Sequence, residues 1–181
     1  MAEHLTERQK QWMASLREGL ERDTGRTLDE WVAIARTCPE TRMMPRLQWF
    51  KREHGLGQNR AIHVLNQAFG SSYGWDRPDE LIEALWKDPA SRAVFETVNA
   101  EVGKLDGVVL GARKGYTAWS RTFQFAAVRP LRGGKARLGL AVEPSADPRL
   151  EPYKREGWSE RLKGALTLAS PGDFDAPLRS L

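Results

Sequence analysis

From Thr122 to Val142 the chain runs TFQFAAVRPLRGGKARLGLAV. Two runs of β-branched, aromatic and small residues, Thr122–Val128 and Ala136–Val142, stand on either side of the pair Gly133-Gly134. Adjacent glycines adopt the positive φ angles that tight hairpin turns require. The stretch therefore predicts a β-hairpin with its turn at these two glycines.

Similar short runs separated by glycine or proline lie on both sides of this hairpin. They predict further strands at Gly107–Ala112, Tyr116–Ser120 and Leu162–Leu168, several of them antiparallel. Residues 141–157 form a polar loop in this scheme, and Asp173–Leu181 a short closing helix. Ahead of the strands, Asp76 with Pro78 and Asp88 with Pro89 begin two helices. The second helix carries an apolar stripe formed by Val94, Val98, Val102 and Leu105. Residues 73–181 are therefore expected to form an α+β domain, with two helices packed on a mostly antiparallel sheet of about five strands.

The N-terminal part has helical periodicity instead. Apolar residues at helical spacing predict helices from Glu3 to Arg22, from Thr27 to about Cys38, from Pro45 to Gly55 and from Gln58 to Phe69. Thr27 and Glu30 have the spacing of a capping box. Residues 1–72 are expected to form a helical module of about four helices. The Gly-, Ser- and aromatic-rich segment 70–77 is the linker candidate.

Composition indicates an ordinary soluble globular protein, with 40% hydrophobic and 29% charged residues. No apolar run reaches the roughly 20 residues that cross a bilayer, and the first ten residues are charged, so we expect a cytoplasmic protein without membrane contact. Eight basic residues and one acidic residue lie between Lys104 and Leu140, a local charge of +7 against +4 for the whole chain. This localised charge favours an anionic partner.

Two blocks resemble known bacterial families. The stretch Thr24–Trp31, the sequence His54-Gly55-Leu56-Gly57 and Ala61 resemble domain of unknown function 4287. A second domain of unknown function, numbered 5655, often follows the first, and it is similar to this chain at Lys114–Thr117, Gln124–Pro130, Leu138–Leu140 and Arg149–Pro152. Gln58-Asn59 replace the usual Gly-His pair, and the end of the chain is shorter than the family pattern. The families carry no settled activity, so the resemblance implies architecture and a cytoplasmic location rather than chemistry.

The first functional candidate is the Gly55-Leu56-Gly57 turn, which is similar to a helix-hairpin-helix signature. Such a turn exposes backbone amides, and the N-terminus of the next helix adds a positive dipole that attracts phosphate. Lys51, Arg52 and Arg60 flank the turn. The simpler alternative is that Gly55 caps one helix and Gly57 only starts the next.

The second candidate is a basic and aromatic stretch. Its residues are Arg113, Lys114, Tyr116, Trp119, Arg121, Arg129, Arg132, Lys135 and Arg137. If the strand near Phe123 is regular, then Arg121, Phe123, Phe125, Ala127 and Arg129 share one face. An exposed face of this kind would offer rings for base stacking and cations for phosphates. The alternative is that Phe123 and Phe125 belong to the core and that the arginines lie at strand ends.

Catalytic and metal chemistry find no support in the sequence. Cys38 is the only cysteine, and the three histidines have no recognised metal-ligand spacing. The acidic pairs Asp29-Glu30 and Asp79-Glu80 fall in first helical turns, where negative charge stabilises the helix dipole. We therefore name no catalytic residue, metal site or cofactor, and enzymatic activity stays uncertain.

These observations lead to three hypotheses. The first is a small non-enzymatic protein that binds DNA or RNA through the Gly-Leu-Gly turn and the basic sheet. The second is a small-ligand or metal-delivery domain with a pocket near Lys114, Tyr116 and Trp119. The third is a protein-interaction adaptor, in which the helical module binds a protein partner through an apolar patch that includes Trp12, Trp31 or Trp49.

Overall fold

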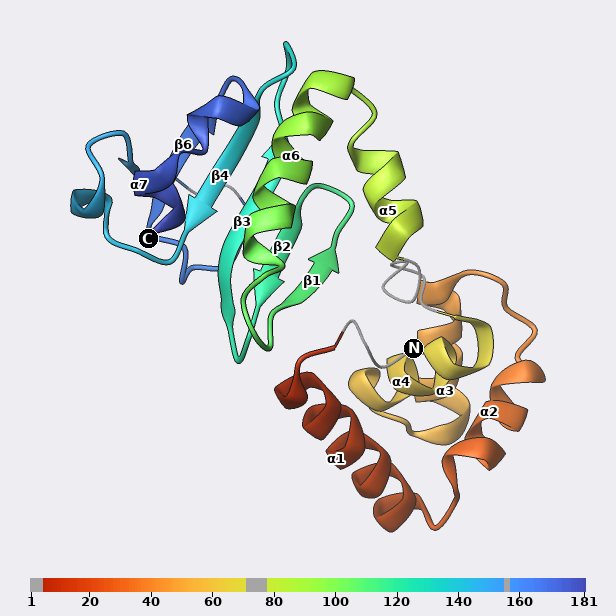
Figure 1. Ribbon diagram of the computed structural model, residues 1–181. Helices are drawn as coiled ribbons and strands as arrows, with labels where there is room; N and C mark the ends of the chain where they lie inside the picture. Colours follow the sequence, from red (N-terminus) through yellow and green to blue (C-terminus); the bar gives the residue numbers. More distant parts are fainter. Residues whose placement is uncertain (1–4, 71–77, 155–156) are drawn as a thin grey trace. The chain divides into compact units, whose positions relative to one another are not determined.

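The computed structural model describes residues 5–70, 78–154 and 157–181. The described residues form two compact units (Figure 1). The first contains the helices α1 to α4, and the second begins at α5. The predicted linker lies, from residue 71 onward, outside the described residues, as do Asp76 and the first two residues of the helix expected from Glu3.

The helical unit contains α1 (Glu7–Thr24), α2 (Leu28–Arg36), α3 (Met43–His54) and α4 (Gln58–Phe69). The predicted capping box is confirmed, because Thr27 Oγ1 accepts from the Glu30 amide and the Glu30 carboxylate accepts from the Thr27 amide. Aromatic and aliphatic residues of all four helices share one core, formed by Leu20, Leu28, Trp31, Val32, Ala35, Phe50, Leu56, Ala61, Val64 and Leu65. Trp12 of α1 lies outside this core and is exposed.

The second unit has the predicted α+β architecture. The helices α5 (Pro78–Leu85) and α6 (Pro89–Val102) precede a six-stranded antiparallel sheet, in the order β1-β2-β3-β4-β6-β5. The strands are β1 (Val109–Ala112), β2 (Thr117–Ser120), β3 (Gln124–Pro130), β4 (Ala136–Leu140), β5 (Glu151–Pro152) and β6 (Gly164–Leu168). Two 3-10 turns, η1 (Pro144–Ala146) and η2 (Pro171–Asp173), and the short helix α7 (Ala176–Arg179) complete it.

The central hairpin has the predicted turn. Gly133 and Gly134 have φ angles of 74° and 73°, which glycine adopts without steric cost. The sixth strand, β5, has two residues and lies in the segment predicted to be a loop. It is too short to produce an alternating pattern in the sequence.

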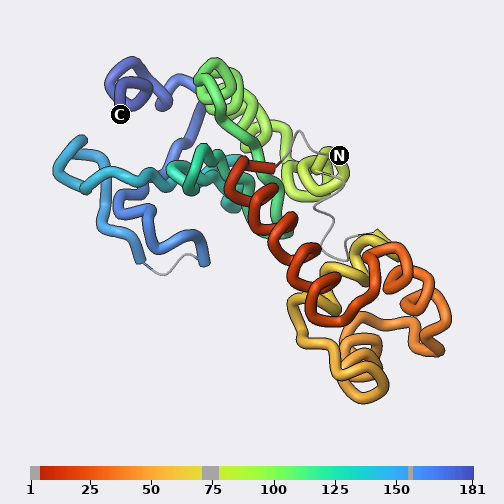
Figure 2. Tube along the Cα trace, turned by 90° about the horizontal axis from the view of Figure 1, so that it is seen from below, coloured from red at the N-terminus to blue at the C-terminus, as the bar shows by residue number. Residues whose placement is uncertain are grey.

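The two faces of the sheet differ. The helix face is covered by α6 (Figures 1 and 2). It carries Trp119, Ala126, Val128, Leu138 and Leu166, which form the main core with residues such as Val94 and Val98. The other face, here called the open face, has a row of small residues at paired positions: Gly111, Ala118, Ala127, Gly139 and Ala165. Trp158 and Leu162 pack against this row.

One predicted face assignment is wrong. The pairing of β2 with β3 shifts register between Trp119 and Ser120, so that Trp119 pairs with Ala126 and Ser120 with Gln124. The extra residue, Phe125, packs against the main core, whereas Ala127 belongs to the cluster on the open face. A bulge of this kind breaks the period-two alternation on which the prediction depended. Leu105, expected on the apolar stripe of α6, lies beyond the helix and is 46% exposed.

Candidate nucleic-acid interface

The antiparallel topology gathers six predicted cations at one end of the sheet. The β1–β2 turn carries Arg113 and Lys114, and the β3–β4 turn carries Arg132 and Lys135. Both turns lie at the same end, because Ala112 pairs with Thr117 and Thr117 pairs with Val128 (Figure 1). Arg129 and Arg137 lie in the adjoining strand positions. We call these six residues the cationic end.

Three members of the cationic end have side chains in solvent. Lys114, Arg132 and Lys135 are exposed, and none forms an ion pair with another residue in the described part of the chain. Arg113 is half-buried, and its guanidinium donates to the Ala112 carbonyl at 2.9 Å. The end therefore presents exposed lysine and arginine head groups that remain hydrated, as phosphate-contacting side chains are before binding.

The other two arginines are part of the sheet itself. Arg129 and Arg137 are directly paired residues on β3 and β4. The Arg137 side chain is 10% exposed and donates to Glu151 at 2.8 Å and to Thr167 at 3.2 Å. This contact also lowers the pKa of Glu151. The Arg129 guanidinium lies 5.6 Å from the ring centroid of Trp158. Both arginines thus have structural contacts on the open face, and Glu151 from β5 compensates the charge of Arg137.

The predicted aromatic residues do not form one stacking platform. Trp119 is 1% exposed, and its indole N–H donates to Asn99 at 3.0 Å. Its ring stacks near Phe95, with centroids 6.2 Å apart. Tyr116 is half-buried beside Trp158, with centroids 6.3 Å apart. A buried ring has no face left for a base, so Trp119 is a core residue in this structure.

Arg121 lies at the opposite end of the sheet from the cationic end. It belongs to the β2–β3 turn, where its amide donates to the Phe123 carbonyl at 3.2 Å. Phe123 is 41% exposed, and the guanidinium of Arg161 lies 3.8 Å from its ring centroid. The predicted basic stretch is therefore divided between two ends of one sheet, separated by the length of the strands.

The Gly-Leu-Gly turn has the capping geometry of the simpler alternative, with Gly55 ending α3 and Gly57 beginning α4. Gly55 has a φ of 63° and caps α3, with its amide donating to the Lys51 carbonyl at 3.1 Å. This bond from a left-handed glycine is that of an αL cap. The Leu56 amide donates to the Phe50 carbonyl, and both side chains are buried. Gly57 is the N-cap of α4 and supplies no side-chain acceptor. The first amides of α4 therefore have no capping side chain.

The cations beside this turn are partly engaged. Arg60 donates to Asp23 of α1, and Arg52 donates to its neighbour Glu53 at 2.6 Å. Lys51 is exposed and forms no ion pair within the described part of the chain. Arg60 thus connects α4 to α1 by an ion pair beside the turn. Hydrogen bonds from Arg22 and Arg60 lower the pKa of Asp23.

The remaining sequence candidates have ordinary structural surroundings. Cys38 is a free, half-buried thiol. Burial lowers the pKa of His63. Across residues 5–70, 78–154 and 157–181, no cluster of three His, Cys, Asp or Glu side chains is arranged to hold a metal. Trp31 is 3% exposed and Trp49 is half-buried, so Trp12 alone of the three tryptophans proposed for an adaptor patch is exposed.

Sequence reasoning missed several residues that shape these surfaces. Trp158, Glu151 and Arg161 come from the segment predicted as a loop and from the stretch after it. The cues available in the sequence were one tryptophan and one glutamate among polar residues. Their contacts with Gly139, Arg137 and Phe123 depend on strand order, which local patterns do not encode.

No helix in the described residues has both the length and the apolar character needed to cross a membrane.

Comparisons with known proteins agree with the two-unit architecture. A family model described as a domain of unknown function (DUF4287) matches residues 12–68. Another, described as a domain of unknown function (DUF5655), matches residues 82–181, which is more than half of the 181-residue chain. No curated protein and no solved structure matches the sequence. The chain therefore belongs to the DUF5655 family, and it carries a DUF4287 domain ahead of the family domain.

Proposed function

We propose that this is a non-enzymatic protein that binds the phosphates of DNA or RNA, with the cationic end of the sheet as its main contact. The observation that carries the proposal is the convergence of exposed Lys114, Arg132 and Lys135 on two neighbouring turns. Each side chain can exchange its hydration for a phosphate and release a condensed counterion. Contacts to phosphate set affinity and leave base sequence unread.

The helical unit provides a second, separate contact in this proposal. The first amides of α4, with Lys51 nearby in sequence, would bind a backbone phosphate at the Gly-Leu-Gly turn. A nucleic-acid partner also fits the cytoplasmic location expected from the sequence. The buried Trp119 and the ion-paired Arg137 support the fold in this proposal, and they do not contact the ligand.

The test is fluorescence anisotropy of labelled single-stranded DNA, duplex DNA and single-stranded RNA over a salt series. We expect dissociation constants on the order of micromolar at low salt and a steep salt dependence. Replacing Lys114, Arg132 and Lys135 together by Gln should weaken binding and reduce the slope of log affinity against log salt by about 2 to 3.

A matched triple variant controls for net charge. Arg36, Arg42 and Lys154 are exposed and lie outside the proposed contacts, and replacing them by Gln removes the same three charges. Equal losses in the two triple variants would mean that binding follows net charge alone. Absence of binding at low salt for all three probes would overturn the proposal.

A further inference from the structure

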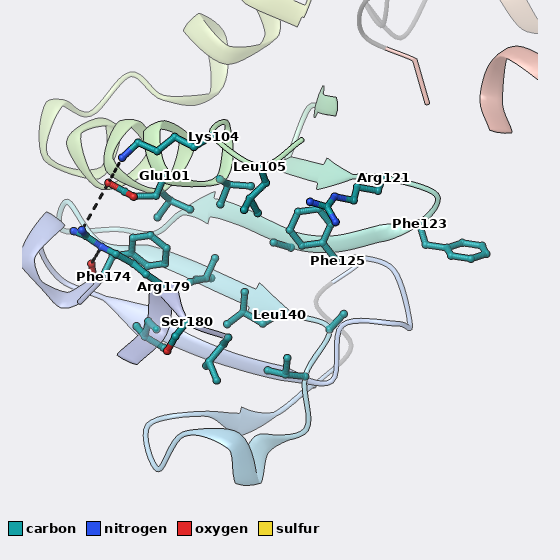
Figure 3. Close-up of a pocket in the computed structure, with 18 of the residues that line it drawn as sticks. Glu101, Lys104, Leu105, Arg121, Phe123, Phe125, Leu140, Phe174, Arg179 and Ser180 are labelled. Carbon is teal, nitrogen blue, oxygen red and sulfur yellow. Dashed lines mark hydrogen bonds and ion pairs between the residues drawn. The ribbon is translucent and has the colours of Figure 1, made fainter. Parts of the chain in front are cut away.

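A cavity of about 830 Å³ opens in the second unit, at the end of the sheet opposite the cationic end. It lies on the helix face, between the C-terminal turn of α6, the strands β3 and β4, and the segment around α7 (Figure 3). Cavities of this size hold small organic ligands. Its lining includes none of Lys114, Tyr116 and Trp119, so the ligand hypothesis applies here to a different set of residues.

The floor and walls of the cavity are apolar. Phe125, Leu138 and Leu140 come from the sheet, and Phe174 and Leu178 come from the segment around α7. The bulge in β3 turns Phe125 toward the cavity (Figure 3). Leu105 and Leu181 also line it while being 46% and 43% exposed. Large apolar side chains that stay in water beside a hollow favour a ligand with an apolar body.

The polar groups of the lining carry a net positive charge. Glu101 is the one acidic residue among them, and it is paired with Lys104 at 2.9 Å and with Arg179 at 3.7 Å (Figure 3). The hydrogen bond from Lys104 lowers the pKa of Glu101, which keeps this carboxylate ionised. A cationic ligand would therefore have to compete with two cations of the protein for Glu101.

Arg121 is the cation of the lining that remains available. It forms no ion pair with the residues that the structure describes, and in Figure 3 it lies beside Phe125. Its guanidinium can donate two parallel hydrogen bonds to one carboxylate. The charged side chains of the whole lining sum to a positive charge, because Lys104, Arg121 and Arg179 outnumber Glu101.

We propose that this cavity binds a small amphipathic organic acid, with its hydrocarbon or aromatic body against Phe125, Leu140 and Leu105 and its carboxylate on Arg121. We infer the apolar body of the ligand from the apolar walls of the cavity, and its anionic head group from the positive charge of the lining. This site is independent of the cationic end, because Arg121 lies in the β2–β3 turn at the other end of the strands.

The test is an amide NMR titration of the full-length chain with octanoate, and with octanol as a probe of similar length that lacks the charge. We expect saturable shift changes at Leu105, Phe125 and Leu140 with octanoate, and weaker binding of octanol. Arg121→Gln should lower the affinity for octanoate about tenfold, as expected when hydrogen bonds to a charged group are lost. Lys87→Gln removes the same charge from an exposed residue of this unit outside the cavity and should leave the affinity unchanged.

A second variant tests the cavity without relying on charge. Ala141 lines the cavity and is exposed, so Ala141→Trp should place a ring in the opening without disturbing the core, and should reduce the binding of both probes. Equal affinity of octanoate and octanol, together with no effect of Arg121→Gln, would refute the carboxylate assignment. Absence of saturable shifts at the cavity would refute the site, and neither outcome would bear on nucleic-acid binding at the cationic end.

Discussion

The indole ring of Trp158 packs directly on the backbone of Gly139. A Cβ atom on Gly139 would lie 2.0 Å from Cζ3 of that ring, far inside any tolerated contact. Gly139 belongs to the row of small residues on the open face, where it lies between Ala127 and Ala165. A glycine in a central strand is thus required here by the close approach of an aromatic ring.

Gly139→Ala should lower the free energy of unfolding by about 2 kcal/mol, because the ring or the strand must shift. Urea unfolding followed by circular dichroism measures the change. Gly115→Ala is the control, since a Cβ there meets no atom within 4 Å. The cost should shrink when Trp158 is replaced by Leu, and strictly additive effects of the two substitutions would contradict the contact.

Trp119 should behave as a core residue and not as a ligand contact. Trp119→Leu removes the hydrogen bond to Asn99 and the packing against Phe95, and should cost about 3 kcal/mol of stability. The affinity of the Trp119→Leu variant for nucleic acid should equal that of the unsubstituted protein at temperatures where both proteins are folded. Phe123→Leu, at an exposed ring, should change stability little. A selective loss of affinity in folded Trp119→Leu would place the ring at the binding surface instead.

The fold was predictable where a local pattern has one structural solution. The Gly133-Gly134 turn, the Thr27 cap and the Asp88-Pro89 helix start are short-range signals, and each is present in the structure. The bulge at Phe125 was not predictable, because one extra residue in a strand leaves the composition of the stretch unchanged. The two-residue β5 exists only because Glu151 and Pro152 pair with the first residues of β6.

The net positive charge of the candidate surfaces could be predicted from the sequence, but the distribution of the cations over the sheet could not. The excess of cations between Lys104 and Leu140 is visible in the sequence. The separation of Arg121 from Arg132 follows from strand direction, since consecutive turns of an antiparallel meander lie at opposite ends of the sheet. The cavity was missed because its walls come from α6, the sheet and α7, which are distant in the chain.

The contact between Asp147 and Arg149 should make stability depend on pH. Asp147 accepts from the Arg149 side chain at 2.7 and 2.9 Å and from its amide at 2.8 Å, and Arg149 also donates to Asp175 at 2.8 Å. The side-chain hydrogen bonds from Arg149 are the main cause that lowers the pKa of Asp147 from 3.8 to about 2. Because the folded-state pKa is the lower one, the contribution is present above pH 3.8 and is lost as pH falls toward about 2.

A double-mutant cycle of Asp147→Asn and Arg149→Gln measures this contribution. The coupling between the two substitutions in urea unfolding should be stabilising near neutral pH and should diminish through the window between about 3.8 and about 2. A coupling energy that stays constant through that pH window would show that the charge of the Asp147 carboxylate does not contribute to its interaction with Arg149.

The Gly-Leu-Gly turn allows helix stability and phosphate binding to be separated by one substitution. Gly57 is the N-cap of α4 in extended backbone, with a φ of −65°, and a Cβ there meets no atom within 4 Å. Asp is a better N-cap than Gly because its carboxylate accepts from the first helical amides, so Gly57→Asp should stabilise α4 by about 0.5 kcal/mol. The same carboxylate would occupy the amides that a phosphate needs and would repel the phosphate.

Gly57→Asp should therefore raise the stability of the helical unit and lower the affinity for single-stranded or duplex probes in the anisotropy assay. Gln48→Glu makes the same change in net charge at an exposed position of α3, where Arg52 one turn later can pair with it. If Gly57→Asp loses affinity and Gln48→Glu does not, the turn contacts phosphate. If both variants bind equally well, the glycines serve only to end α3 and begin α4, and binding depends on the cationic end alone.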